Sequence, residues 1–166
     1  MRVLARFVAP ASSLRVDAET GSGFRLTIDS GSAEPPAGPA PREMVLAGLA
    51  TCTGMDVASI LAKKRQVPDA YQVTVEAQLA PDPPRVFTRI VIEHRVEGAV
   101  EPEALRRAVE LSATRYCPVS AMLSRAVVLE HRYRLIQPGQ AVREVLVVVT
   151  APDGEPRGVG RGMHSA

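Results

Sequence analysis

PREMVLAGLATCTGMDVASILAKKR, residues 41–65, is apolar on almost every side when it is drawn as a helix. A helix without a broad polar face is expected in the middle of a core, so we expect the rest of the chain to be arranged around this one. Two residues that such a helix does not require, Cys52 and Asp56, stand four positions apart. That spacing places the thiol and the carboxylate on one face, one turn from each other. They are either a packing accident or a reaction site.

The composition predicts a soluble globular protein of one domain, with an appendage at most. The chain has 166 residues, of which 46% are apolar and 23% charged, enough for a sizeable core. A net charge of +2 is too small to indicate nucleic acid or a membrane surface as a partner. No run approaches the ~20 apolar residues of a membrane span, and Arg6 and Pro10 interrupt the N-terminal segment too early for a signal peptide.

A cytoplasmic location is therefore the default expectation. In that compartment thiols are kept reduced, and disulfides are transient and catalytic or redox-sensing more often than structural. The two cysteines of this chain, Cys52 and Cys117, are accordingly interpreted as reduced, catalytic or redox-cycling residues.

The residues before the long helix are predicted to form strands and then a loop. Apolar and polar residues alternate over 1–9 and 23–29, and a further strand is expected over 13–20. SGSAEPPAGPAP, residues 30–41, has no periodic pattern and is long for a loop in a compact domain. We interpret it as a lid, an arm or a plain surface linker.

The residues after the long helix alternate between strands and helices. A strand that begins at Val73 and a strand over 85–97 are predicted to form an antiparallel hairpin. The later elements are a helix over 102–115, a short helix over 118–125, a strand over 126–136, one more strand over 142–150 and a mobile tail over 154–166. Hairpins with helices between them, rather than regular βαβ alternation, indicate an α+β fold with antiparallel sheets around the central helix.

Cys117 directly precedes a proline. Such a residue avoids helical backbone angles, so Cys117 is a natural N-cap for the helix that begins at Pro118. The unpaired N–H groups and the positive end of the helix dipole would stabilise a thiolate there, and Arg115 is near in sequence. By this reasoning alone Cys117 is the more activated thiol. The alternative is a small apolar residue at a helix junction.

Asp56 affects the chemistry of Cys52. A carboxylate one turn away raises the pKa of the thiol by repulsion unless a cation offsets it. The candidate cations are Arg15, Arg42 and Arg115, which the sequence does not rank by distance. Asp56 can equally be a buried, hydrogen-bonded structural residue.

Glu43 and Arg42 precede Cys52 by nine and ten residues. In an unbroken helix Glu43 then lies about 180° away from Cys52 and Arg42 only about 80° away. Glu43 can serve Cys52 if the helix bends, for example at Gly48, or if Glu43 belongs to a neighbouring site across a dimer.

No metal or organic cofactor is expected. His94 and His131 fall on the inward faces of their strands, and we interpret them as core histidines held by hydrogen bonds. A metal site would require more ligands than these two. The chain also contains no Cys/His spacing of zinc type, no Gly-rich phosphate loop and no Ser-His-Asp arrangement.

Two segments resemble the OsmC/Ohr family of bacterial thiol peroxidases. They are PREMVLAGLATCTGMDVASIL (41–61) and, about 65 positions later, LSATRYCPVSAML (111–123). The likeness runs over residues 1–136, and 137–166 is a C-terminal extension outside it. The Cys-x-x-x-Asp-Val pattern of Cys52, Asp56 and Val57 is similar to that of an OsmC-like branch of the family.

The resemblance implies a fold and a reaction. The family fold is an intertwined homodimer with two six-stranded sheets around central helices and active sites at the subunit interface. By resemblance Cys52 is the peroxidatic cysteine and Cys117 resolves it. We therefore expect a thiol-dependent peroxidase that reduces organic hydroperoxides or hydrogen peroxide in oxidative-stress defence. An external dithiol, in the Ohr branch a lipoylated protein, would reopen the Cys52–Cys117 disulfide, and the family binds no metal or organic cofactor.

The chain departs from the family at the residues that hold the thiolate. Well-studied members use an arginine of an N-terminal loop and a glutamate ten positions before the first cysteine. Here that position is Arg42, with Glu43 displaced by one, and Arg15 is the nearest candidate for the loop arginine. Arg15 or Arg42 would stabilise the thiolate, and Asp56 or Glu43 would orient that arginine or handle a proton.

Two other interpretations remain open at this point. One is an OsmC-like dimer that binds a small apolar ligand and keeps the cysteines as relics or as a redox sensor. The other is a purely structural role in which both cysteines are packing residues.

Overall fold

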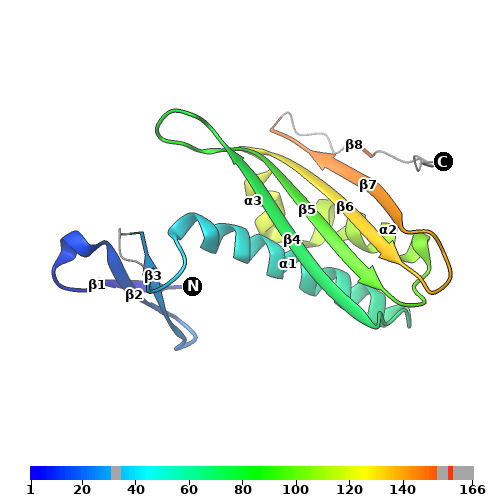
Figure 1. Cartoon of the computed structure of the whole chain (residues 1–166), viewed down its shortest axis with the longest axis horizontal. Coiled ribbons are helices and arrows are strands. Elements are labelled where there is room, and N and C mark those ends of the chain that lie inside the picture. Colours follow the sequence, from blue (N-terminus) through cyan, green and yellow to red (C-terminus); the bar gives the residue numbers. More distant parts are fainter. Residues whose placement is uncertain (31–34, 153–156, 159–166) are drawn as a thin grey trace. The chain divides into compact units, whose positions relative to one another are not determined.

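The computed structural model describes residues 1–30, 35–152 and 157–158, in two compact units, Met1–Val45 and Leu46–Ala166 (Figure 1). The first unit is a three-stranded antiparallel sheet in the order β1-β2-β3, formed by Val3–Phe7, Arg15–Thr20 and Arg25–Asp29. A turn at Gly23, whose φ of 88° suits a residue without a Cβ, leads into β3.

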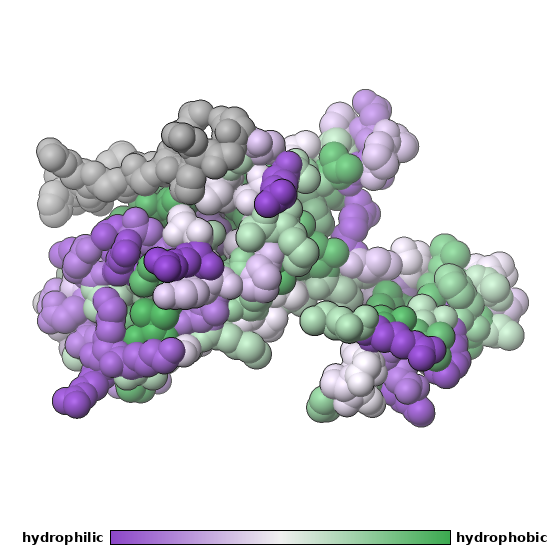
Figure 2. All heavy atoms as spheres, turned by 180° about the vertical axis from the view of Figure 1, so that it is seen from behind, coloured by the Kyte–Doolittle hydropathy of each residue, from purple (hydrophilic) through white to green (hydrophobic). Residues whose placement is uncertain are grey.

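This sheet has almost no core of its own. Among the described residues of the unit only Ala18 and Asp29 are buried. Val3, Phe7 and Phe24 are each more than 60% exposed, and apolar residues are visible at the surface of the molecule in Figure 2. A three-stranded sheet with its large apolar side chains in water lacks the buried face that stabilises such a sheet.

The long helix α1 spans Pro41–Lys63, and each end has a local cause. Pro41 needs no hydrogen-bond partner in the first turn, and the Glu43 carboxylate accepts the Ala40 N–H at 2.7 Å. At the other end Arg65 adopts a φ of 58° and the Gln66 N–H reaches back to the Leu61 carbonyl at 2.9 Å, which ends the helix.

Only one side of α1 is covered by the chain, contrary to the expectation of a helix in the middle of a core. The buried residues of α1 are Leu49, Thr53, Gly54, Val57 and Leu61, mostly four apart along one stripe. The remaining sides are half-buried or exposed, and Met55 is 72% exposed. These sides are apolar, so covering them with another apolar surface would be favourable.

By length and hydropathy α1 could also cross a membrane, and it is the one such helix in the part of the chain that the structure describes. This corrects the expectation that no segment approaches a membrane span. The core helix of a soluble protein has the same length and composition, so the property does not place the helix in a membrane.

The second unit contains a five-stranded sheet in the order β4-β5-β6-β7-β8 (Figure 1), whose strands are Ala70–Leu79, Phe87–Glu97, Val128–Ile136, Arg143–Thr150 and Arg157–Gly158. The expected antiparallel hairpin is present as β4 and β5. However, β6 pairs with β5 in parallel, so this sheet is mixed and not antiparallel as predicted. The helices between β5 and β6 carry the chain back to the starting edge, and such a crossover produces parallel pairing.

The crossover consists of α2 (Pro102–Leu111), one π-helical turn η2 (Ser112–Tyr116) and α3 (Pro118–Leu123). The helix predicted over 102–115 is therefore α-helical only as far as Leu111. Figure 1 shows α1, α2 and α3 on one face of the five-stranded sheet. The core lies between them, and it includes Ile90, Val96, Leu105 and Leu129, all fully buried.

The C-terminal extension contributes to this core. β7, the strand anticipated over 142–150, places Val147 and Val148 in a cluster with Leu105, Tyr133 and Leu135. β8 pairs with Val148 and Val149, so Arg157–Gly158 form a strand and not part of a mobile tail. The rest of the predicted tail, 154–156 and 159–166, lies outside the described residues.

Two histidines lie side by side in the core. His94 of β5 and His131 of β6 are fully buried on the helix-covered face of the sheet. The Tyr71 hydroxyl is 2.7 Å from His94 Nδ1, whereas neither ring nitrogen of His131 has a partner within the described part of the chain. The expectation of hydrogen-bonded core histidines thus holds for His94 only.

The histidines are held in the neutral state. Burial, with a smaller contribution from the neighbouring His131, lowers the pKa of His94 to about 3. Burial also lowers the pKa of His131 to about 4. Burial raises the pKa of Tyr71, so its hydroxyl keeps its proton and shares a neutral hydrogen bond with His94 Nδ1.

We predict that shortening Val148 to alanine destabilises the protein although the residue lies outside the 1–136 segment. Val148 is 1% exposed, and the lost methyl groups and the cavity that they leave cost about 2 kcal/mol. The melting temperature should fall by roughly 4–8 °C. Val142→Ala is the control, because Val142 is 47% exposed and its loss should change little. Equal effects of the two variants would show that β7 does not contribute to the core.

We also predict that the histidine pair makes stability depend on pH. The unfolded chain binds protons below about 6.5, whereas the folded chain keeps both rings neutral down to about 4. Stability is therefore full above pH 6.5 and is lost as the pH falls toward 4. Each ring contributes a slope of about 1 kcal/mol per pH unit within that window. Urea unfolding at several pH values should show a shallower slope for His131→Leu, and an unchanged slope would contradict the prediction.

Candidate active site

Both cysteines are free thiols and belong to one cluster of core residues. Cys52 lies on α1 and is half-buried, and Cys117 lies at the start of α3 and is 2% exposed. The same cluster contains the apolar residues Leu49, Ile90 and Leu129. The two thiols are close enough that Cys117 contributes to the raised pKa of Cys52. The fold thus brings together two thiols that are 65 positions apart in the sequence.

Cys117 is the N-cap of α3, as its place before Pro118 predicts. Its backbone is extended, with φ −73° and ψ 107°, and its Sγ accepts the Ser120 N–H at 3.3 Å. The sulfur is therefore fixed by a backbone hydrogen bond beneath the first turn of the helix.

Cys52 is protonated at neutral pH within this unit. Burial, the largest cause, together with Cys117 and the negative charge of Asp56, raises the pKa of its thiol to about 11. The Val119 N–H acts in the opposite direction. The repulsion between Asp56 and Cys52 has the predicted sign. The main causes of this shift include no arginine or lysine of the described residues.

Asp56 is tied to a residue of the crossover. Its Oδ2 accepts a hydrogen bond from the Ser112 hydroxyl at 3.0 Å, and the Ser112 and Thr53 hydroxyl oxygens are 2.9 Å apart. Asp56 therefore has the hydrogen-bonded role that was considered for it, and it still lies close enough to Cys52 to affect its charge state.

The other predicted site residues are all exposed. Arg15, at the start of β2, and Arg42 and Glu43, at the start of α1, belong to the unit Met1–Val45. Glu43 uses its carboxylate to bind the Ala40 N–H. Arg115 lies on η2 in the same unit as the cysteines. The structure thus groups Cys52, Asp56 and Cys117 in one unit and places three of the charged candidates in the other.

Sequence reasoning missed Ser112, Thr53 and the Val119 N–H. Ser112 and Thr53 are fully buried hydroxyls on otherwise apolar faces of α1 and η2. Buried hydroxyls require partners, so two of them near the cysteine positions were a usable signal. The backbone N–H of Val119 has no signature in the sequence.

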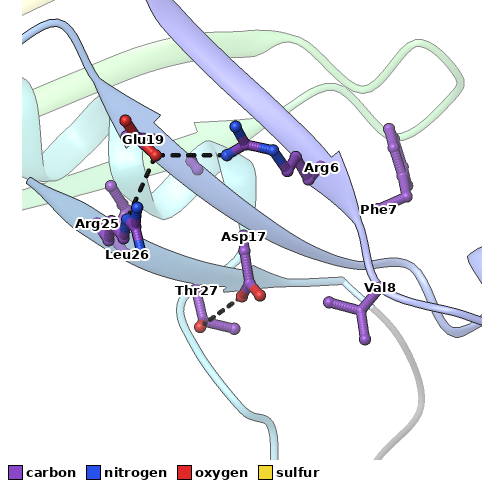
Figure 3. A pocket seen from close by; sticks show the side chains of 9 residues that line it. Arg6, Phe7, Val8, Asp17, Glu19, Arg25, Leu26 and Thr27 are labelled. Carbon is purple, nitrogen blue, oxygen red and sulfur yellow. Dashed lines mark hydrogen bonds and ion pairs between the residues drawn. The ribbon is translucent and has the colours of Figure 1, made fainter. Parts of the chain in front are cut away.

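A separate hollow of about 700 Å³ lies on the first unit (Figure 3). Glu19 bridges Arg6 and Arg25 at 3.4 and 3.3 Å, and the Thr27 hydroxyl donates to Asp17 at 2.9 Å. The hollow contains neither cysteine. Among the described residues no three His, Cys, Asp or Glu side chains converge in a group that could hold a metal ion.

Comparison with known proteins identifies the family. Residues 31–132 match the family model described as OsmC-like protein. Protein YhfA of Escherichia coli (strain K12) is 37% identical over 119 residues, which cover 71% of this chain and 87% of YhfA.

Solved structures agree on the fold. An OsmC-like protein from Mycoplasma pneumoniae superposes with a TM-score of 0.71 at 15% identity, covering 81% of this chain and 96% of that one. An organic hydroperoxide resistance protein OsmC from Legionella pneumophila gives 0.58 at 18% identity, covering 82% and 97%. At these identities the likeness shows the fold alone. The family model and the likeness to YhfA show more, and this chain belongs to the OsmC/Ohr family, which includes organic hydroperoxide resistance proteins.

Proposed function

We propose that this protein is a thiol-dependent peroxidase that reduces organic hydroperoxides or hydrogen peroxide through a Cys52–Cys117 disulfide cycle, in defence against oxidative stress. The proximity of the two free thiols in one core cluster is the observation that carries the proposal. Membership of a family that includes organic hydroperoxide resistance proteins supports it. A cytoplasmic location, where thiols stay reduced, is part of the proposal.

The cycle has three steps. The Cys52 thiolate attacks the distal peroxide oxygen; a sulfur–oxygen bond forms, the oxygen–oxygen bond breaks, and the leaving alkoxide takes a proton to become an alcohol. Cys117 then attacks the sulfur of the resulting sulfenic acid, which forms the disulfide and releases water. An external dithiol, such as that of a lipoylated protein, reduces the disulfide by exchange and is itself oxidised.

The first step requires a cation. With the pKa of Cys52 raised to about 11, only a small fraction of the thiol is ionised at neutral pH. A guanidinium next to the sulfur would lower that pKa and would also offset the charge of Asp56. Arg15 and Arg42 are the proposed sources, with Asp56 or Glu43 to orient the arginine or handle the proton.

The proposal includes an intertwined homodimer. Met55 and Val45 of α1 are exposed, and the sheet of the first unit has its apolar side chains in water. A second copy of the chain is the partner that would cover both surfaces.

One observation favours the non-enzymatic alternative, an OsmC-like dimer that binds a small apolar ligand or senses redox state. A thiol with a pKa of about 11 reacts slowly with peroxides. Slow reaction is what we expect of a binding protein whose cysteines are not catalytic. In that case Cys52→Ser would leave ligand binding intact, and the parent protein would show no turnover with a dithiol.

The peroxidase proposal predicts which thiol each variant leaves reactive. Cumene hydroperoxide or hydrogen peroxide added to the reduced protein should consume two thiols and produce one Cys52–Cys117 disulfide, detected by mass spectrometry. Cys52→Ser should lower turnover by roughly a thousandfold or more, as loss of a nucleophile does in other enzymes. Cys117→Ser should stop at the Cys52 sulfenic acid, which dimedone traps. Thiols that oxidise no faster than free cysteine would refute the peroxidase.

The dimer predicts an effect of charge on the exposed side of α1. Sedimentation of the parent protein should give the mass of two chains, whereas Met55→Glu should shift it toward one chain, because the interface would bury an unpaired carboxylate. Met55→Leu keeps the side chain apolar and should remain dimeric. A parent protein that sediments as a monomer at micromolar concentration would exclude this assembly.

A further inference from the structure

Ser112 connects the two segments that carry the cysteines. Its side chain is fully buried at the point where α2 passes into η2. On one side its hydroxyl contacts α1, through Asp56 Oδ2 at 3.0 Å, Thr53 Oγ1 at 2.9 Å and the Thr53 carbonyl oxygen at 3.4 Å. On the other side its carbonyl oxygen accepts the Cys117 N–H at 3.0 Å.

These contacts are made close to both cysteines. Thr53 directly follows Cys52, and Asp56 lies one turn further along the same helix. A single residue thus fixes α1 next to the first cysteine and holds the backbone of the second. Because Ser112 and Cys117 are five positions apart, their bond is the wide one of a π-helical turn. An α-helical continuation would pair the Cys117 N–H with Ala113 and would turn Cys117 to a different side.

The direction of the hydrogen bonds follows from chemistry. An ionised carboxylate can only accept, so the one hydroxyl hydrogen of Ser112 points to Asp56, the nearer of its two carbonyl or carboxylate contacts. The Thr53 hydroxyl then donates to the Ser112 oxygen. Ser112 therefore restrains the Asp56 carboxylate and stabilises its negative charge with a hydrogen bond. Without the hydroxyl, Asp56 would lose this hydrogen bond.

We infer that Ser112 is the positioning residue of the Cys52/Cys117 pair. Through Asp56 it limits the repulsion between the carboxylate and a Cys52 thiolate, which adds to the larger effect of burial, and through the π-helical turn it sets the approach of Cys117 to Cys52. This inference deepens the proposed peroxidase function and rests on it for its biological meaning. Its physical content, the ionisation and the pairing of the two thiols, does not require peroxide.

The first test measures how readily Cys52 ionises. Iodoacetamide alkylation of Cys52 between pH 8 and 10, in a Cys117→Ser background, reports the thiolate fraction, because the reaction rate is proportional to it below the pKa. Ser112→Ala should slow alkylation roughly three- to tenfold, as expected when a nearby carboxylate is released. In an Asp56→Asn background the same substitution should have little effect. A purely structural role of Ser112 would slow or speed both backgrounds alike and would overturn the inference.

The second test measures the pairing step. Diamide oxidises the reduced protein to the disulfide without peroxide, and the rate in Ser112→Ala should fall about tenfold or more, because small misplacements of reacting groups are costly. Ser120→Ala is the matched control. Ser120 is equally buried, its hydroxyl has no partner within the described part of the chain, and its backbone N–H, which caps Cys117, is retained. Equal slowing in both variants would overturn the inference.

A third variant covers the case in which Ser112→Ala does not fold. Thr53→Val keeps the shape of the side chain and removes the hydroxyl that donates to Ser112. It should shift alkylation and disulfide formation in the same directions, by less. Unchanged rates in a folded Thr53→Val protein would then count against the inference. A parent protein that forms the disulfide with diamide but ignores peroxides would refute the peroxidase and leave the role of Ser112 intact.

Discussion

The packing of one stripe of α1 against the core of the second unit determines where the Cys52 and Asp56 side chains lie. Leu49, Thr53, Val57 and Leu61 recur every four residues and are fully buried. Gly54 belongs to the same contact, since a Cβ there would be 3.1 Å from the Val73 side chain. Cys52 and Asp56 each precede a stripe residue by one position, so the helix rotation that buries the stripe leaves them half-buried at its border. A thiol in that position can meet both a core partner and an approaching substrate.

The same packing limits the reactivity of the site. Burial next to Cys117 brings the two sulfurs together, but burial is also the largest reason that the pKa of Cys52 rises. Among the described residues of the second unit, the Val119 N–H stabilises the thiolate and the Asp56 carboxylate repels it. The second unit therefore brings the two sulfurs together, as a disulfide cycle requires, but does little to stabilise the Cys52 thiolate. The proposed mechanism takes the missing positive charge from Arg15 of the first unit, whose described residues form almost no core of their own.

What the sequence predicted well is local. Pro41 and Glu43 indicate the start of α1, alternation indicates the β4–β5 hairpin, and a residue before proline makes Cys117 a cap; each depends on neighbours along the chain. What it missed is non-local. The parallel pairing of β6 with β5 depends on how the crossover folds back, and the bond from Ser112 to Asp56 spans 56 positions. Composition marked α1 as apolar all round, yet it could not distinguish a helix covered by its own chain from one that is half covered.

The helix dipole favours Cys117 as the reactive thiol, whereas the family resemblance favours Cys52. Cys117 has the better placed helix N-terminus, but its sulfur is almost fully buried and already engaged with the Ser120 N–H. Cys52 is the more accessible thiol and therefore the one that a peroxide can reach first. With Glu43 engaged in capping α1, Asp56 is the predicted acid that lies in the same unit as this thiol. A single guanidinium between Asp56 and Cys52 would neutralise the first and ionise the second. In the proposed cycle, one arginine could neutralise Asp56 and ionise Cys52 because Ser112 holds the Asp56 carboxylate in a fixed position.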